Sequence, residues 1–461
     1  MTRFKSSLLC SVLALCLIFG MTACSSARVA TPASDPLLAK SRVQPLVGSF
    51  QVESFQLTNG LKILIVEDHS SPTFAYQTWF NVGSRDEVRP RTGLAHFFEH
   101  LMFKATTNHP EGEFDRILEA AGVEDENAFT SWDYTAFVQE LPKNKLDLII
   151  GLESDRMSHL IVNEESFKTE REVVKNELRY RNENNPDGKI FETLYKLAFT
   201  KHSYQWPVIG SVSDLDGMKA QDARDFYHAH YSPNNAVIAI VGDVSPNEVL
   251  QKIEKAYGSL PAQNLPTHTI PVEPTQTSVR SKRISLSIQV EKLTMAYHIP
   301  SVMSSDMPAI LLLDAVLTGG KSSRLQRALV ETGIASGVNT SPMEQKDPSL
   351  FLFEVGLQAH RKAAEAESVI LREMKRLSQE PVPDSELERA KNISQFAFYQ
   401  GMDGNGQKAN FLGRYESMAG DYTRGLQIQS QMQAITPEQL QAVVQKYFTT
   451  NGRTVVTGVI Q

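Results

Sequence analysis

Cysteine is nearly absent from this sequence. There are three cysteines in 461 residues, and all of them stand at or before position 24: Cys10, Cys16 and Cys24. The rest of the chain therefore has no means of building a disulfide framework or a cysteine metal site.

The sequence also lacks a basic run, and it lacks an apolar run long enough to cross a bilayer. The apolar stretch from Leu8 to Phe19 is shorter than the roughly 20 residues that a transmembrane helix needs. Lys and Arg number 46 against 53 Asp and Glu, which gives a net charge of −7. An acidic chain of this kind is a poor candidate for binding nucleic acid.

The first residues are typical of a secretory signal. Arg3 and Lys5 precede the apolar stretch, and Cys24 follows directly after Ala23, so we predict a signal peptide over residues 1–23. A cysteine after small residues resembles the bacterial lipoprotein cleavage site, which predicts lipidation of Cys24 and a location in the periplasm, anchored to the outer membrane. Ordinary cleavage near Ala23 is the alternative. Residues 24–48, rich in Ser, Ala and Pro, predict a flexible tether.

Two parts of the chain carry the same pattern. Three residues of the first part recur 216 positions later in the second: Tyr231, Asn235 and Gly242 as Tyr447, Asn451 and Gly458. An alternating strand over residues 74–80 has a loose counterpart over residues 293–299. This repetition indicates a duplicated unit of about 200 residues, longer than the units of solenoid proteins.

The repeat predicts two homologous domains, at residues 49–260 and 283–461. Four prolines mark a linker over residues 261–282 that cannot be regular structure; they are Pro261, Pro266, Pro271 and Pro274. Strands and helices mix without strict alternation, which favours an α+β fold in which each domain packs helices on a mostly antiparallel sheet.

One short segment concentrates histidine and glutamate on a helix that is otherwise apolar. It reads Gly93-Leu94-Ala95-His96-Phe97-Phe98-Glu99-His100-Leu101-Met102-Phe103-Lys104. At about 100° per residue, its three polar side chains lie on one face of the helix. Burying them without partners costs several kcal/mol, and a metal cation would serve all three. The order His-x-x-Glu-His is the inverted zincin signature; a pair of core histidines sharing a hydrogen bond is the alternative.

A second, charged helix is predicted over residues 164–184. Glu170 and Glu177 stand seven positions apart in it, which places both on one face. Most charges on such a helix form a solvated face, so the spacing by itself does not assign either residue to the histidines.

Taken together, these motifs resemble the pitrilysin family of metallopeptidases, which includes insulin-degrading enzyme and the mitochondrial processing peptidase. The family's third metal ligand follows the second histidine after 76 intervening residues, and Glu177 stands at that distance from His100. Besides the histidine segment, the matching segments are Gly83-Ser84-Arg85-Asp86-Glu87, Asn127-Ala128-Phe129-Thr130-Ser131 and Glu170-Arg171-Glu172-Val173-Val174-Lys175-Asn176-Glu177.

The resemblance implies a zinc metalloendopeptidase that acts on peptides or unfolded polypeptides. Zn²⁺ would be held by His96, His100 and Glu177, which leaves a fourth position for water, as catalytic zinc sites do. Glu99 would be the catalytic base, and Glu170 a further catalytic-site residue that supports the centre electrostatically.

The resemblance also places Asn127 and Ala128 on an edge strand, where a substrate would add as an extra strand. A turn position is the alternative for Asn127.

The second half has no counterpart of the histidine motif and is expected to hold no metal. In the family such halves help to close a chamber built from four units. Because this chain has two, we expect a homodimer or a heterodimer with a related subunit. The alternative function is a non-catalytic assembly subunit of a pitrilysin-type complex; the retention of every ligand and of the base favours the enzyme.

Overall fold

The computed structural model describes residues 40–123, 126–267 and 269–461, which belong to one compact unit. The predicted signal peptide over residues 1–23 and the predicted lipidation site at Cys24 lie outside the described residues. Among the helices that are described, none combines the length and the hydrophobicity needed to cross a bilayer.

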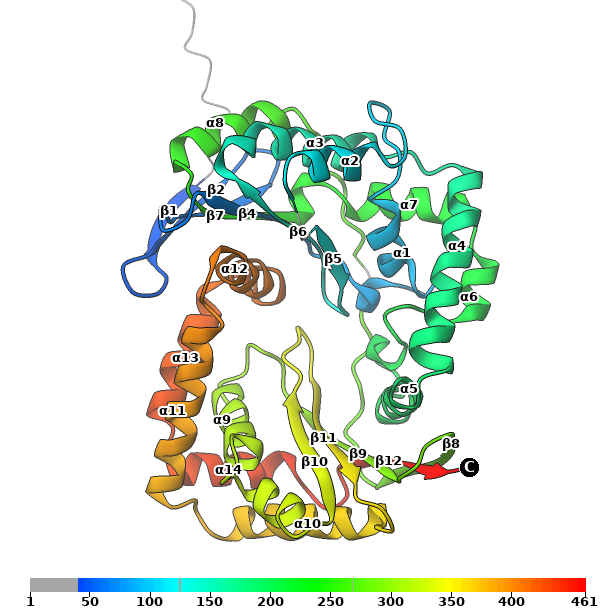
Figure 1. The fold of residues 1–461 in the computed structure, drawn as a ribbon, viewed down its shortest axis with the longest axis vertical. Coiled ribbons are helices and arrows are strands. Elements are labelled where there is room, and N and C mark those ends of the chain that lie inside the picture. The colour runs from blue at the N-terminus through cyan, green and yellow to red at the C-terminus, as the bar shows by residue number, and fades with distance from the viewer. Residues whose placement is uncertain (1–39, 124–125, 268) are drawn as a thin grey trace, which may run out of the picture. The chain divides into compact units, whose positions relative to one another are not determined.

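Each half of the described chain builds its own β-sheet (Figure 1). The sheet of the first half has seven strands in the order β1 (Lys40–Pro45), β2 (Gln51–Gln56), β3 (Lys62–Glu67), β7 (Ala236–Gly242), β4 (Thr73–Phe80), β6 (Thr135–Pro142) and β5 (Asn127–Thr130). The sheet of the second half has five strands in the order β10 (Ala335–Pro342), β11 (Ser349–Leu357), β9 (Lys292–Ile299), β12 (Arg453–Ile460) and β8 (Arg280–Leu286).

The two sheets repeat one plan. The order β3-β7-β4-β6-β5 in the first matches β8-β12-β9-β11-β10 in the second. Neighbouring strands are antiparallel except for one corresponding pair in each sheet, β3 with β7 and β8 with β12. The predicted α+β fold of two similar halves with mostly antiparallel sheets is therefore confirmed.

Two predicted boundaries change. Part of the segment 24–48, predicted as a flexible tether, forms strand β1, which pairs antiparallel with β2 and aligns Arg42 with Ser54. Strand β8 begins at Arg280, inside the predicted linker 261–282. Both are strands at the edge of a sheet, ordered by hydrogen bonds to a neighbouring strand, which composition does not reveal.

Helices cover the sheets on both faces. Those of the first half are α1 (Leu94–Leu101), α2 (Glu113–Ala120), α3 (Leu146–His159), α4 (Glu164–Leu178), α5 (Pro186–Ala198), α6 (Val212–Gly217), α7 (Ala220–His230) and α8 (Pro246–Tyr257). Those of the second half are α9 (Met307–Thr318), α10 (Ala363–Gln379), α11 (Asp384–Gln400), α12 (Asn405–Ala419), α13 (Thr423–Ala434) and α14 (Pro437–Tyr447).

Each half lends one helix to the sheet of the other (Figure 1). Helix α12 of the second half packs on β4 and β7, and helix α5 of the first half packs on β9 and β12. The approach of α12 requires glycine at position 413, because a Cβ atom there would lie 2.1 Å from the indole nitrogen of Trp79. Beneath α5, Leu194 and Tyr195 share an apolar core with Leu350. The two halves are therefore interlocked.

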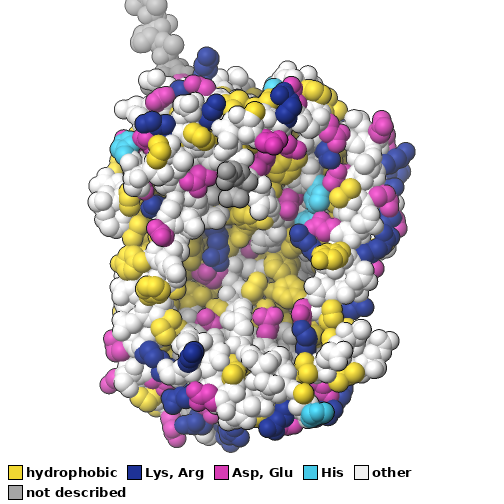
Figure 2. All heavy atoms as spheres, viewed as in Figure 1, with side chains coloured by type: hydrophobic (Ala, Val, Ile, Leu, Met, Phe, Trp, Pro, Cys, Tyr) yellow, Lys and Arg dark blue, Asp and Glu magenta, His cyan; other side chains and the backbone are white. Residues whose placement is uncertain are grey.

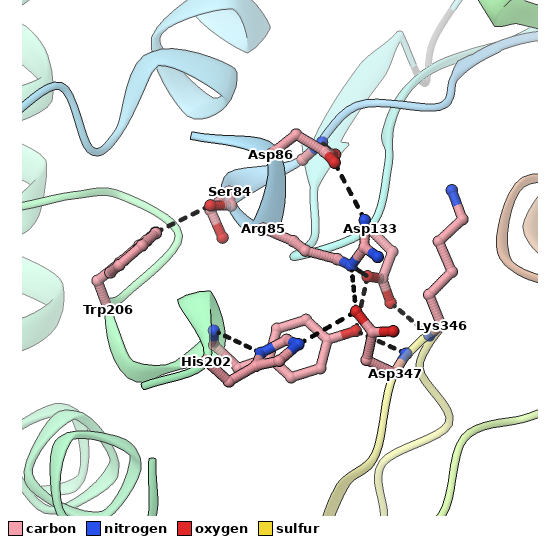
Figure 3. A network of polar contacts seen from close by, with 10 residues as sticks. Ser84, Arg85, Asp86, Asp133, His202, Trp206, Lys346 and Asp347 are labelled. Atoms are coloured by element: carbon pink, nitrogen blue, oxygen red, sulfur yellow. Dashed lines mark hydrogen bonds and ion pairs between the residues drawn. The ribbon is translucent and has the colours of Figure 1, made fainter. Parts of the chain in front are cut away.

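A polar cluster also joins the halves (Figure 3). The carboxylate of Asp347, in the loop between β10 and β11, accepts hydrogen bonds from Arg85 Nε at 2.5 Å and from His202 Nε2 at 3.1 Å. Beside it, buried Asp133 accepts from the Tyr204 hydroxyl at 2.7 Å. Because Asp133 belongs to the turn between β5 and β6, the cluster fixes that turn against the second half.

We expect Asp347→Asn to lower the free energy of unfolding by about 2 kcal/mol at neutral pH. Burial raises the pKa of Asp347, but the hydrogen bonds from His202 and Arg85 outweigh it and lower the pKa from 3.8 to about 2. A depressed pKa stabilises the fold above the unfolded value and loses that effect as the pH falls through the folded value. The difference between variant and wild type should therefore shrink between pH 4 and pH 2, measured by urea unfolding.

The matched control is Asp187→Asn, which removes an exposed ion pair between the halves. Asp187 is 68% exposed and contacts Lys292 Nζ at 2.6 Å. An exposed pair contributes about 0.5 kcal/mol or less. Equal destabilisation by the two variants would contradict a special role for the cluster around Asp347.

Candidate metal centre

Helix α1 carries the histidine motif, and its start is held by two features of the chain. Gly93 precedes it with φ of 100°, and a Cβ atom there would lie 2.6 Å from the Ile209 carbonyl oxygen, so glycine is required. The carboxylate of Glu87 accepts hydrogen bonds from the backbone N–H groups of Gly93 and Ala95 at 2.7 and 2.8 Å. An acid at the positive end of a helix stabilises it, and here it fixes the position from which the histidines project.

His96 and His100 lie one turn apart on α1, with their ring centroids 4.9 Å from each other. His96 is buried, and His100 is partly exposed. Their partner comes from α4, which packs against α1. The Glu177 carboxylate lies 3.6 Å from His96 Nε2 and 3.1 Å from His100 Nε2. The structure therefore brings together the three residues predicted as metal ligands.

The arrangement fits a cation. One ligand atom from each of His96, His100 and Glu177 lies within 4.8 Å of the other two. Both ring nitrogens of His96 are buried and form no hydrogen bond with the residues that the structure describes. Buried polar atoms of this kind are rare without a partner, and two imidazoles with one carboxylate are a donor set typical of catalytic zinc.

The electrostatic field at the centre favours positive charge. Burial lowers the pKa of His100, but the carboxylates of Glu170 and Glu177 outweigh it and raise the pKa to about 9. The pKa of Glu177 is itself lowered: burial acts against this, and the nearby imidazoles and the Arg181 guanidinium prevail. Two ionised carboxylates thus surround the imidazoles.

Glu170 lies behind His100 rather than among the three ligand atoms. Its carboxylate is 2.8 Å from His100 Nδ1 and 2.8 Å from Lys104 Nζ. Burial raises the pKa of Glu170, yet the hydrogen bonds with His100 and Lys104 outweigh it and lower the pKa. The carboxylate therefore accepts a hydrogen bond from Nδ1 and leaves Nε2 of His100 facing Glu177. This contact fixes the orientation of the His100 ring.

We expect Glu170→Gln to weaken zinc binding roughly 10- to 100-fold, because an outer carboxylate orients the imidazole and makes it more basic. A competitive titration with a chromophoric chelator measures this affinity. Glu172→Gln is the control, since Glu172 is on the same helix, mostly exposed, and pairs with Lys175 away from the histidines. An unchanged affinity in Glu170→Gln would contradict the assignment.

Glu99 lies on α1 between the two histidines but is not part of the ligand cluster. Its Oε2 atom accepts a hydrogen bond of 2.6 Å from the Thr130 hydroxyl. Thr130 belongs to β5, so this bond connects the predicted base to the strand predicted to receive substrate.

Asn127 and Ala128 lie at the start of β5, which is the last strand in its sheet and, among the residues that the structure describes, pairs only with β6. Asn127 is exposed, and its side chain accepts a hydrogen bond from the Ala128 N–H. No described strand pairs with the outer edge of β5, and the strand lies next to Glu99. This is the geometry that strand addition needs.

Three contacts of the centre were not predicted from the sequence. Lys104 neutralises Glu170, Arg181 lies 2.9 Å from Glu177, and Thr130 holds Glu99. Arg181 follows Glu177 by four positions, which is the usual spacing of a helical ion pair. The sequence alone could therefore have predicted this ion pair. The contacts of Lys104 with Glu170 and of Thr130 with Glu99 depend on how α1 packs against α4 and β5, so the sequence alone does not predict them.

Models of two known protein families together match most of the chain. The description "Insulinase (Peptidase family M16)" matches residues 62–211, which include α1 and α4. The description "Peptidase M16 inactive domain" matches residues 217–394.

The chain is also similar to individual known proteins over most of its length. A zinc protease of Helicobacter pylori, PqqE, is 31% identical over 399 residues, which cover 84% of this chain and 86% of that protein. A probable mitochondrial-processing peptidase subunit beta of Arabidopsis thaliana is 24% identical over 85% of this chain and 75% of that protein. The crystal structure of a protease from Helicobacter pylori superposes with a TM-score of 0.83 at 30% identity, over 88% of this chain and 99% of that one.

Proposed function

The chain belongs to peptidase family M16, the insulinase or pitrilysin family, and from this premise we propose that it is a zinc metalloendopeptidase that hydrolyses peptides or unfolded polypeptides in the bacterial periplasm. The observation that carries the proposal is the meeting of His96, His100 and Glu177 within 4.8 Å, with Glu99 beside them on the same helix. A cluster of three metal-ligand side chains with a further carboxylate beside it suits hydrolysis.

His96 and His100 through a ring nitrogen, and Glu177 through its carboxylate, would hold the metal. Zn²⁺ held there would act as a Lewis acid: it would lower the pKa of a water molecule to about 7 and polarise a peptide carbonyl. Zinc suits this task because hydrolysis needs no redox chemistry.

Glu99 moves the proton. Its carboxylate takes a proton from the attacking water and gives it to the nitrogen of the leaving amine as the peptide bond breaks. The OH group remains on the carbonyl carbon, so the products are a carboxylic acid and an amine. The hydrogen bond from Thr130 to Oε2 leaves the other oxygen of Glu99 to do this.

The outer edge of β5 would align the substrate. An extended peptide adds there as a further strand, with its backbone hydrogen-bonded beside Asn127 and Ala128. Backbone pairing depends on an extended conformation more than on the side-chain sequence. We therefore propose unfolded polypeptides as the substrates.

Location and partners complete the proposal. The amino-terminal sequence supports export and a lipid anchor at Cys24, and the two-unit chain supports a homodimer or a heterodimer with a related subunit. If the protein contains zinc but cleaves no peptide, either alone or with a related subunit, the result would instead support a role as a non-catalytic assembly subunit.

The direct test is removal and return of the metal. We expect a strong chelator to abolish cleavage of an unfolded polypeptide, and stoichiometric Zn²⁺ to restore it after the chelator is removed. Elemental analysis of the same samples should show one zinc per chain in the active state. Full activity in protein proven free of metal would refute the proposal.

A further inference from the structure

An aromatic cavity lies on the opposite face of the first sheet from the metal centre. Thr130 points to Glu99, and its neighbour Phe129 points to the other face because side chains alternate along a strand. The cavity has a volume of about 460 Å³, within the range of ligand pockets. Aromatic side chains dominate its lining: Trp79, Phe129, Tyr134, Phe398, Phe411 and Tyr415.

The floor of the cavity is a row of residues that crosses three strands. Trp79 on β4 pairs with Ala136 on β6, and Ala136 pairs with Phe129 on β5. The small alanine lets the two aromatic rings meet, with centroids 5.3 Å apart and nearly perpendicular. The row ends at the unpaired edge of β5. A residue of any added strand would stand next in this row, beside Phe129.

The roof comes from the second half, through helices α11 and α12. The Tyr415 hydroxyl and the Arg414 guanidinium both donate to the Glu344 carboxylate, at 2.8 and 2.9 Å. These bonds satisfy the polar groups of Arg414 and Tyr415, and the aromatic rings of α11 and α12 line the cavity. Figure 2 shows hydrophobic side chains gathered in the hollow on this face of the molecule.

We propose that this cavity binds a large apolar side chain of the substrate, preferably an aromatic one, and so selects where the substrate strand is placed. The inference rests on the proposed function, because the occupant is a peptide added to β5. Alternate residues of that peptide point to the face of Phe129, and one of them enters the cavity. Aromatic walls favour edge-to-face contact with an aromatic guest.

The test fills the cavity from its exposed rim. Asn410 is exposed, on α12, and lines the cavity, so Asn410→Phe adds a ring there without disturbing the buried core. Asn392→Phe is the matched control, because Asn392 is exposed on α11 and does not line the cavity. The probes are fluorescent, otherwise polar peptides that carry Phe, Leu or Ser at one central position.

Binding is measured by anisotropy in the zinc-loaded Glu99→Gln background, where cleavage is suppressed. We expect the Phe peptide to bind about tenfold or more tightly than the Ser peptide. Asn410→Phe should reduce this preference to about threefold or less while leaving the Ser peptide unchanged. Asn392→Phe should retain the full preference.

The outcomes separate this inference from the proposed function. If wild-type protein cleaves peptides in a chelator-sensitive way and the Glu99→Gln protein binds the Phe and Ser peptides equally, the cavity assignment alone is overturned. A preference that survives Asn410→Phe also overturns it. If Asn410→Phe changes the oligomeric state and keeps the preference for the Phe peptide, the cavity is a contact between two copies of the chain. That result also overturns the assignment to a substrate side chain. Absence of any zinc-dependent cleavage refutes both.

Discussion

Glu99→Gln should lower kcat for peptide hydrolysis by about a thousandfold, the range expected when a general base is lost. The amide keeps the size of the side chain, and its oxygen still accepts the hydrogen bond that the Thr130 hydroxyl donates to Glu99. The substitution therefore removes the proton acceptor and preserves the local structure. Steady-state cleavage of an unfolded polypeptide measures the loss, and elemental analysis should show that the variant retains zinc.

Glu172→Gln serves as the control for this substitution. It makes the same chemical change on α4, where Glu172 is mostly exposed and pairs with Lys175, and its turnover should stay within about twofold of wild type. Wild-type turnover in Glu99→Gln would eliminate Glu99 as the base. Loss of zinc together with activity would show a role in metal binding instead.

Glu177→Gln should have the largest effect on metal content. The Glu177 carboxylate faces both imidazoles, at 3.6 and 3.1 Å, and it is the only ligand of the three that carries a negative charge. We expect zinc affinity to fall by more than the roughly 10- to 100-fold expected for Glu170→Gln, and hydrolysis to fall with it. A competitive zinc titration and elemental analysis measure the change.

Glu183→Gln is the matched control, because Glu183 is exposed beyond the end of α4. Zinc affinity and hydrolysis should both be unchanged in it. Undiminished zinc affinity in Glu177→Gln would show that the metal uses another third ligand, and the assignment based on spacing would fail.

The grouping of residues at the candidate metal centre was largely predictable, because these residues are close in sequence or fixed by spacing. Periodicity alone places His96, Glu99 and His100 on one face of a helix. It does not choose between Glu170 and Glu177, which share a face of α4; that choice needed the family spacing. The structure gives a physical reason for the difference, since Glu177 reaches both Nε2 atoms and Glu170 contacts Nδ1 of one ring.

The contacts between the halves were beyond sequence reasoning. The repeat of Asn235 and Gly242 as Asn451 and Gly458 predicted two similar halves, and the strand orders agree with it. Nothing in a linear pattern shows that Asp347 contacts Arg85, because the two are 262 positions apart. The aromatic cavity is hidden for the same reason, as its floor and roof come from different halves.

The exchange of helices between the halves has a consequence for biosynthesis. The last strand of the first sheet, β7, ends at Gly242, whereas α12 begins at Asn405. The apolar face around Trp79 therefore has no cover until residues 405–419 are available to pack on it. The first half thus completes its core only when α12 is present, which makes the folding of the two halves interdependent.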